Sequence, residues 1–275
     1  MGLKLQSVAT RQGWTWARDG ARLFLRRPIA FSAMLLLFLV AFIVWSVLPV
    51  VGLLALAALP LLSLGFMVAS RSVLRGGLAH PGQFIQPLLG DARQRRHLLL
   101  LCGLYGVGAW LVLLLTQWTY GDALDTLLQA IATHGMASEQ ALRANADPRL
   151  SRGMLVLAST GGALSVPFWH AQALVVWGGQ SAWQALFSST FALWRAKGAY
   201  LVYSIAWAAS AVLTSLLLGV VGGMLGPSPM VGMLAFAVTL MLSTGFYVSL
   251  WFSFVDCFGS PDEGDAAPAT ADAAS

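Results

Sequence analysis

The feature that most constrains the fold of this chain is a set of six long apolar stretches that contain no Asp, Glu, Lys or Arg. They cover residues 29–48, 50–70, 98–118, 154–178, 199–225 and 230–255. A helix needs about 20 mostly apolar residues to cross the hydrocarbon core of a bilayer, where the backbone must satisfy its own hydrogen bonds. The sequence therefore predicts an all-α integral membrane protein whose transmembrane helices, about six in number, form three hairpins.

The charged residues are few, and their positions exclude several classes of protein. Only 10% of the 275 residues are charged, against about 25% in a soluble domain. The net charge of +5 comes from basic residues beside the apolar stretches, which favours a membrane surface over nucleic acid as the partner. The spacing of Cys102 and Cys257 indicates neither a metal site nor a redox pair, and the sequence holds no catalytic motif. We therefore expect no cofactor, no metal and no enzymatic activity.

The distribution of Lys and Arg predicts the orientation of the helices. Of the 16 Lys and Arg residues, six lie in 1–28, five in 71–97 and two in 179–198, whereas 119–153 holds three. Cytoplasmic loops carry the excess of Lys and Arg in membrane proteins. We therefore expect the first three segments on the cytoplasmic side, with the N-terminus and the C-terminus both in the cytoplasm.

Amphipathic elements precede the apolar stretches. Before the first stretch, Trp14, Phe24 and Leu25 are among the residues that share one helical face, and arginines share the other. A similar element with Trp183 on its apolar face precedes the fifth stretch, and a weaker one at 84–96 precedes the third. Helices of this kind lie in the plane of the membrane interface. We therefore predict an amphipathic interfacial helix on the cytoplasmic side before each hairpin.

The basic residues of these elements are candidates for contact with anionic lipid headgroups, because each contributes about 1 kcal/mol of attraction to an acidic leaflet. They are Arg18, Arg22, Arg26, Arg27, Arg93, Arg95, Arg96, Arg195 and Lys197. The expected partner is therefore the lipid bilayer itself.

These patterns divide the chain into three parts. Residues 1–28 form a cytoplasmic amphipathic helix, residues 29–255 form the six-span membrane domain, and residues 256–275 form a disordered acidic cytoplasmic tail. An outer insertion at 119–153 has helical character, and a second short helix is expected to start at Ser138, a favourable N-cap residue. We expect the insertion to lie as a lid on the outer membrane surface; a gate or a partner-docking element is the alternative.

The fourth apolar stretch carries the one notable group of polar side chains in the predicted spans. Its members are Ser159, Ser165, His170 and Gln172. An ionisable residue within a span is by default a candidate functional group. A neutral histidine can also simply bond to a neighbouring hydroxyl or carbonyl group, and no second His, Asp or Glu is expected at its depth. We therefore favour a structural role for His170 and treat the four residues as a candidate binding face.

Proline and glycine residues mark local features of three spans. Pro60 and Pro167 lie inside spans and are expected to kink them. In the fifth stretch, Gly219 with Gly223 and Gly222 with Gly226 form two GxxxG patterns. Such patterns favour close packing between helices.

Several short motifs carry a resemblance to a known family. The run Gly13-Trp14-Thr15-Trp16 is followed by Gly20, Leu23-Phe24 and Arg27-Pro28, and further matches lie at Pro60, Gly65-Phe66-Met67, Ala185-Leu186-Phe187-Ser188 and Trp194-Arg195. Over most of residues 13–256 the chain resembles a family of uncharacterised multi-pass inner-membrane proteins of Gram-negative beta-proteobacteria. The resemblance implies a location in the bacterial inner (cytoplasmic) membrane, and it carries no activity.

Two classes of function remain open. The lack of charge in the spans and of catalytic motifs favours a non-enzymatic membrane scaffold, accessory or lipid-interacting module. The kinked spans and the polar face of the fourth stretch favour the alternative, a small-solute or lipid transporter or channel. A polar cavity that water reaches at the depth of the bilayer midplane would favour the transporter, because a scaffold should be sealed.

Overall fold

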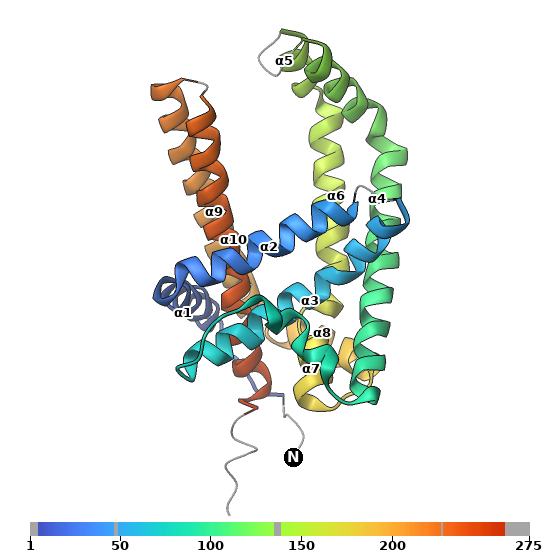
Figure 1. The fold of residues 1–275 in the computed structure, drawn as a ribbon, viewed down its shortest axis with the longest axis vertical. Coiled ribbons are helices and arrows are strands. Elements are labelled where there is room, and N and C mark those ends of the chain that lie inside the picture. The colour runs from blue at the N-terminus through green and yellow to red at the C-terminus, as the bar shows by residue number, and fades with distance from the viewer. Residues whose placement is uncertain (1–4, 47–48, 135–138, 227, 262–275) are drawn as a thin grey trace, which may run out of the picture.

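The computed structural model describes residues 5–46, 49–134, 139–226 and 228–261, and these residues form helices without any β-strand (Figure 1). The α-helices are α1 (Gln12–Arg26), α2 (Pro28–Ser46), α3 (Pro49–Leu74), α4 (Ala92–His134), α5 (Glu139–Asn145), α6 (Pro148–Phe168), α7 (Ala171–Gly178), α8 (Ala182–Arg195), α9 (Lys197–Leu225) and α10 (Pro229–Phe258). Two short 3-10 helices, η1 (Pro81–Phe84) and η2 (Gln86–Leu89), lie between α3 and α4.

Three helical hairpins form the body of the molecule. α2 packs against α3, α4 packs against α6, and α9 packs against α10. Figure 1 shows α4–α6 and α9–α10 rising as two arms, with α2–α3 running transversely between them. At the lower end lies what we call the base: α1, α7 and α8 together with the helix ends packed on them.

Among the described residues, five helices are long and apolar enough to cross a membrane: α2, α3, α4, α9 and α10. The predicted all-α integral membrane protein is therefore confirmed. The stretch expected to form the fourth span, 154–178, is not among the five.

That stretch is divided into two helices beside Pro167, where we expected only a kink within one span. α6 ends at Phe168 and α7 begins at Ala171. Pro167 lacks an N–H, and its ring clashes with the carbonyl four residues earlier, so it disrupts the helix. The hydroxyl of Ser189, from α8, satisfies the break: it accepts a hydrogen bond from the His170 N–H at 3.1 Å and donates to the Val166 carbonyl at 3.4 Å.

The third span continues further than expected. We predicted a span at 98–118 followed by a separate insertion at 119–153, but α4 is one helix of 43 residues from Ala92 to His134. At about 1.5 Å per residue this helix is roughly twice as long as the hydrocarbon core is thick. The short helix expected after it is α5, which begins at Glu139; the predicted cap, Ser138, lies outside the described residues.

α1 is docked on α9 and α10 by a face that overlaps the predicted one only in part, because Phe24 is buried as expected. Its buried residues include Gly13, Trp16 and Gly20, whereas Trp14 and Leu25, both expected on the apolar face, are 59% and 66% exposed. A Cβ atom at position 13 would lie 1.9 Å from the carbonyl oxygen of Ala199, and one at position 20 would lie 2.1 Å from the Cβ of Ser249. Only glycine lets the helices approach this closely.

A hydrogen bond between residues near opposite ends of the sequence stabilises the same interface. The Trp16 Nε1–H donates to Asp256 Oδ2 at 2.7 Å. Asp256 belongs to α10, which ends at Phe258. The prediction that a disordered tail begins at residue 256 is therefore wrong. Residues 262–275, the rest of that predicted tail, lie outside the described part of the chain.

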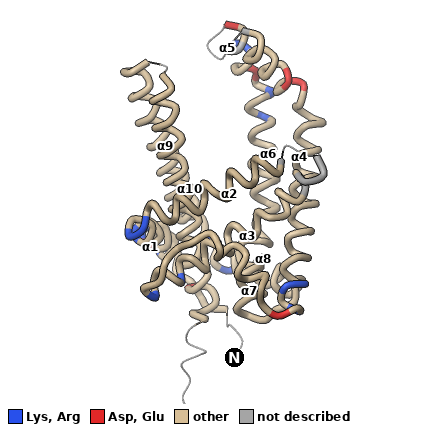
Figure 2. The backbone as a smooth tube through the Cα atoms, in the orientation of Figure 1, with Lys and Arg blue, Asp and Glu red and all other residues tan. Residues whose placement is uncertain are grey.

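Charged side chains gather at the two ends of the molecule. Figure 2 shows Lys and Arg around the base, α1 included, a second charged group near α5, and uncharged helix between the base and that group. This separation is the one expected for a protein whose middle lies in hydrocarbon, because charge there is costly.

Candidate functional site

A pocket of about 210 Å³ lies where α3, α4, α6, α7 and α10 meet, and we call it the central pocket. Its wall is mostly apolar, and it contains no charged residue. The polar residues of the wall are Ser63, Tyr105, Ser165, Trp169, Gln172 and Tyr247. All three helical hairpins contribute to it, the first through α3, the second through α4 and α6, and the third through α10. The pocket therefore exists only in the assembled fold.

The polar groups of this wall differ in how they are satisfied. The hydroxyls of Ser63 and Ser165 donate to carbonyls of their own helices, those of Pro60 and Gly161, each at 2.9 Å. By contrast, the Gln172 Nε2 and the Trp169 Nε1 are buried and have no hydrogen-bond partner within the described part of the chain. A buried donor without a partner costs about 1–3 kcal/mol, so these two groups require an explanation.

The structure separates the four residues of the predicted binding face. Ser165 and Gln172 line the central pocket. His170 is fully buried beside it, and Ser159 is exposed with its hydroxyl bonded to the Leu155 carbonyl at 2.7 Å. The break after Phe168 changes the direction of the chain, so positions on either side of it do not share one helical face.

Four further polar residues of the wall were not predicted: Ser63, Tyr105, Trp169 and Tyr247. Tyr105 and Tyr247 come from spans expected to be plain membrane helices. Trp169 stands two residues after Pro167. The one sequence signal for its role in the wall was an aromatic residue with a polar N–H group close to a proline. Their convergence depends on how the hairpins pack.

His170 belongs to a separate buried network. Its Nε2 lies 2.7 Å from the Tyr200 hydroxyl, which in turn lies 3.5 Å from the Cys257 sulfur. Ser253 lies 3.5 Å from the same His170 nitrogen. The network joins the start of α7 to α9 and α10, and its residues do not line the central pocket. This geometry suits the structural role that the sequence suggested.

The basic residues predicted to contact lipid are all exposed and lie in or directly after α1, at the start of α4 and where α8 meets α9. Arg18 is also paired with Asp19, at 2.9 Å. Two further arginines were missed: Arg71 and Arg75, at the end of α3, line an open polar pocket of about 380 Å³ together with His80 and Gln83. The guanidinium of Arg71 lies 5.8 Å from the centre of the Trp177 ring.

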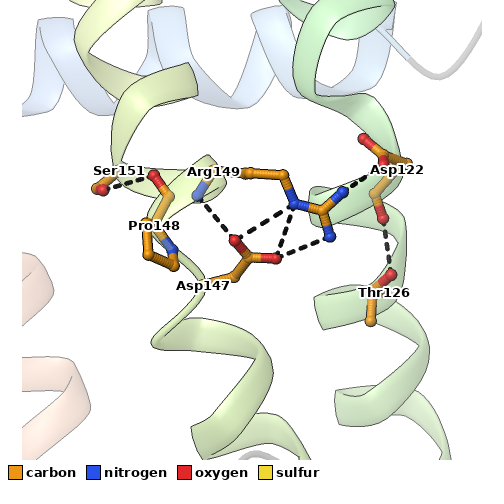
Figure 3. Close-up of polar contacts among 6 residues, drawn as sticks. All are labelled: Asp122, Thr126, Asp147, Pro148, Arg149 and Ser151. Carbon is orange, nitrogen blue, oxygen red and sulfur yellow. Dashed lines mark hydrogen bonds and ion pairs between the residues drawn. The ribbon is translucent and has the colours of Figure 1, made fainter.

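At the far end, an ion cluster ties α4 to the start of α6 (Figure 3). Arg149 bonds to Asp122 of α4 at 2.8 Å and to Asp147 at 2.9 Å. Asp147 also caps α6 by accepting a hydrogen bond from the Arg149 N–H. The hydrogen bonds from Arg149 lower the pKa of the Asp147 carboxyl. Within the described residues, no group of three or more His, Cys, Asp or Glu could hold a metal ion.

One known protein is similar to this chain over almost its full length. It is named as a probable inner membrane protein of Burkholderia thailandensis and is 29% identical over 269 residues, which cover 95% of this chain and 96% of the relative. The resemblance to inner-membrane proteins of beta-proteobacteria is thereby confirmed. No protein-family model matches the chain, and no solved structure matches it.

Proposed function

We propose that the protein is a non-enzymatic, lipid-interacting module of the bacterial cytoplasmic membrane that holds anionic headgroups against its base. In this proposal the base and both ends of the chain face the cytoplasm, where Lys and Arg are enriched in membrane proteins. The observation that carries the proposal is the exposed aromatic face of α8.

α8 turns small residues toward the protein and large aromatic residues away from it. Ala182, Ala185, Ser189 and Ala192 are buried. Trp183, Phe187 and Trp194 are between 65% and 73% exposed. A row of exposed aromatic side chains on one helix marks an interaction surface, and Trp in particular is enriched at the membrane–water interface.

Basic groups lie next to this aromatic face. The Lys197 ammonium is 5.3 Å from the centre of the Trp194 ring, and Arg195 is exposed beside it. An amphipathic helix with aromatic and basic residues binds membranes that contain anionic lipid. The polar pocket lined by Arg71 and Arg75 adds two further basic groups to the protein.

Lipids that copurify with the protein test the proposal. The ratio of phosphatidylglycerol to phosphatidylethanolamine bound to the purified full chain should exceed the ratio in the membrane of origin. The double substitution Arg95→Gln with Arg96→Gln should lower this enrichment, because each arginine contributes about 1 kcal/mol of attraction to an acidic surface.

A matched control comes from the opposite end of the molecule. Arg143→Gln with Arg152→Gln also removes two positive charges, but from residues at α5 and the start of α6. This control should leave the enrichment unchanged. The proposal would be refuted if the lipid ratio were the same in the wild type, in the Arg95→Gln, Arg96→Gln variant and in the membrane of origin.

A transporter or channel is the second candidate, because the central pocket places polar groups at a break between two helices, as in many transporters. Cysteines substituted for Ser63 and Ser165, in a chain whose Cys102 and Cys257 are replaced by alanine, would detect it. Labelling of both positions by a membrane-impermeant thiol reagent, added from either side of sealed vesicles, would favour transport over the non-enzymatic module.

A further inference from the structure

We propose that the pocket at the end of α3 is a binding site for a phosphate monoester, the group carried by phosphatidic acid and by soluble sugar phosphates. This is the open pocket of about 380 Å³ that Arg71, Arg75 and His80 line, and we call it the arginine pocket. The proposal goes beyond the headgroup preference proposed above, because it concerns a single site with its own selectivity, and Arg95 and Arg96 do not line that site.

The end of α3 brings the two arginines together. The Arg75 N–H donates to the Arg71 carbonyl at 3.2 Å, so the two side chains lie one helical turn apart on the same side. Directly after them, the Gly77 N–H donates to the Ser72 carbonyl at 2.8 Å, and Gly76 has a φ of +83°. This glycine motif ends the helix after Arg75 and satisfies the Ser72 carbonyl.

Hydrogen bonds hold the loop that completes the pocket. The Ser72 hydroxyl and the Gln83 Nε2 both donate to the Leu78 carbonyl, each at 3.0 Å. The Gln83 Oε1 accepts a hydrogen bond from the His80 N–H at 3.1 Å, and Gln83 is 2% exposed. These bonds fix the loop without a ligand, so binding requires little further ordering of the chain.

The loop turns its polar side chains to this pocket and its apolar ones elsewhere. Residues three apart eclipse each other in a 3-10 helix, and His80, Gln83 and Gln86 all line the arginine pocket. Phe84 and Ile85 line a different, apolar pocket of about 440 Å³ between the loop, α2 and α3. The pattern of η1 and η2 therefore provides a polar wall for the arginine pocket.

The donors of the pocket are within reach of a ligand. Arg75, His80 and Gln86 are exposed, and Arg71 is partly exposed. The cation–π contact of Arg71 with the Trp177 ring, at 5.8 Å, limits the rotation of its guanidinium. Within the described part of the chain, the lining holds no Asp or Glu. Two arginines outweigh the roughly half negative charge of a helix C-terminus, so the pocket attracts anions.

The number of donors favours a phosphate monoester over other anions. Each guanidinium can donate two parallel hydrogen bonds to one anion, and the His80 ring and the Gln86 amide can donate further ones. A phosphate monoester offers about two negative charges and three acceptor oxygens, whereas a phosphate diester or a carboxylate offers fewer of both. We therefore expect the pocket to select the monoester over the diester.

A phosphate monoester has two sources at this position. Arg71 lies in the last turn of a helix that is apolar enough to cross a membrane, so a lipid headgroup and a soluble compound can both reach the pocket. Four probes separate the sources. Dioleoyl phosphatidic acid is a lipid monoester, dioleoyl phosphatidylglycerol a lipid diester, glycerol-3-phosphate a soluble monoester, and dioleoylglycerol a lipid without phosphate.

Each probe is added to the purified full chain in dodecyl maltoside micelles at an ionic strength of about 0.15 M, where attraction between exposed charges more than about 8 Å apart is screened. Binding is measured by native mass spectrometry and by the shift in Tm. We expect one molecule of phosphatidic acid, of glycerol-3-phosphate or of either to bind and to raise the Tm. Phosphatidylglycerol should bind about tenfold more weakly, and dioleoylglycerol should not bind.

The pattern of binding identifies the source of the phosphate. Binding of phosphatidic acid without glycerol-3-phosphate identifies a lipid headgroup as the ligand. Binding of glycerol-3-phosphate identifies a soluble phosphate compound, because the phosphate group then suffices without the acyl chains.

Substitutions at Arg75 separate charge from geometry. Arg75→Gln should weaken binding of the monoester by about tenfold or more, the effect of a lost charge-assisted hydrogen bond. Arg75→Lys keeps the charge but loses the planar fork of donors, so it should cause a smaller loss. Gln86→Ala removes an uncharged donor and should weaken binding by about threefold.

The double substitution Arg95→Gln with Arg96→Gln is the matched control. It removes two positive charges outside the pocket and should leave binding of phosphatidic acid unchanged, whether or not it lowers the enrichment of phosphatidylglycerol. Three results would each overturn the proposal: neither monoester binds, the wild type binds phosphatidic acid and phosphatidylglycerol equally, or Arg75→Gln and Gln86→Ala both bind as the wild type does. If Arg75→Gln fails to fold, the selectivity of the wild type and the Gln86→Ala variant decide.

Discussion

The base and the arm formed by α9 and α10 bury their surfaces in different ways. In the base, Trp16 is 1% exposed and Gly13 lies against the backbone of α9. In the arm formed by α9 and α10, side chains such as Leu216 and Val220 remain about 60% exposed, and no described atom lies within 4 Å of a Cβ built at Gly219. Protein atoms cover the face of α1 that carries Gly13 and Trp16, and lipid is left to cover the arm.

The difference shows where glycine matters. The GxxxG patterns of α9 favoured close helix packing, but Gly219 and Gly223 face open space in the described structure. The close approaches occur at Gly13 and Gly20 of α1, which are seven residues apart and therefore on one helical face. In hydrocarbon, van der Waals packing is a main source of helix association, so the close contact of α1 with α9 and α10 stabilises the base.

The largest difference between the base and the arm is expected for alanine substitutions at glycine, with the greater loss of stability at position 13. The new Cβ would meet a backbone oxygen that cannot move away, so Gly13→Ala should lower the free energy of unfolding by about 1–3 kcal/mol, as overpacking usually does. Gly219→Ala is the matched control and should be neutral or stabilising by about 1 kcal/mol, since alanine is the better helix former. The Tm of both variants in micelles is the measurement, and equal shifts would contradict the contrast.

Ser189→Ala sharpens the comparison within the base. The substitution leaves the buried His170 N–H at the helix break without its partner, at a cost of about 1–3 kcal/mol. Thr190→Ala, on the exposed side of the same helix, should cost no more than about 0.5 kcal/mol. Chemical denaturation of the two variants would show the difference; a smaller effect at position 189 than at 190 would mean that the break is satisfied in another way.

The smallest effect is expected at the tip of the other arm, where the pKa of Asp147 is lowered by Arg149. A carboxyl group whose pKa is lower in the folded state stabilises that state above its unfolded pKa, and this contribution is lost as the pH falls through the folded pKa. The protection of the amides at the start of α6 against hydrogen exchange, taken relative to the intrinsic exchange rate at each pH, should therefore fall below about pH 4. Asp147→Asn keeps a capping side chain and should show no such pH dependence.

Much of the fold follows from the sequence because a bilayer allows few alternatives. Uncharged stretches of about 20 residues in a membrane must be helices, since no water is present to bond the backbone. The helical hairpins α2–α3 and α9–α10 and the short helices before spans one and five lie where the sequence places them. Periodicity placed the face of α1 less well, because it favours large apolar residues, whereas the contact with α9 and α10 is made by glycines and Trp16.

The candidate site depended on tertiary structure to a greater extent. Ser165 and Gln172 could be singled out as polar residues in an apolar stretch, but the same argument also selected Ser159, which is exposed. It overlooked Tyr105 and Tyr247, which lie 142 positions apart in the numbering and meet in one pocket. A residue's neighbours across a pocket are fixed by the packing of hairpins, and hydrophobic periodicity contains no information about that packing.

The sequence by itself determined that the chain is helical, belongs in a membrane and carries its basic residues at the ends of the apolar stretches. These properties follow from the cost of exposing backbone and charge to hydrocarbon, which each segment meets on its own. Only the tertiary structure decided that the fourth stretch breaks at Phe168, that α1 docks through glycine, and that Trp169 and Gln172 remain unpaired in a shared wall. Those outcomes depend on contacts between distant segments, and such contacts exist only once the hairpins have packed.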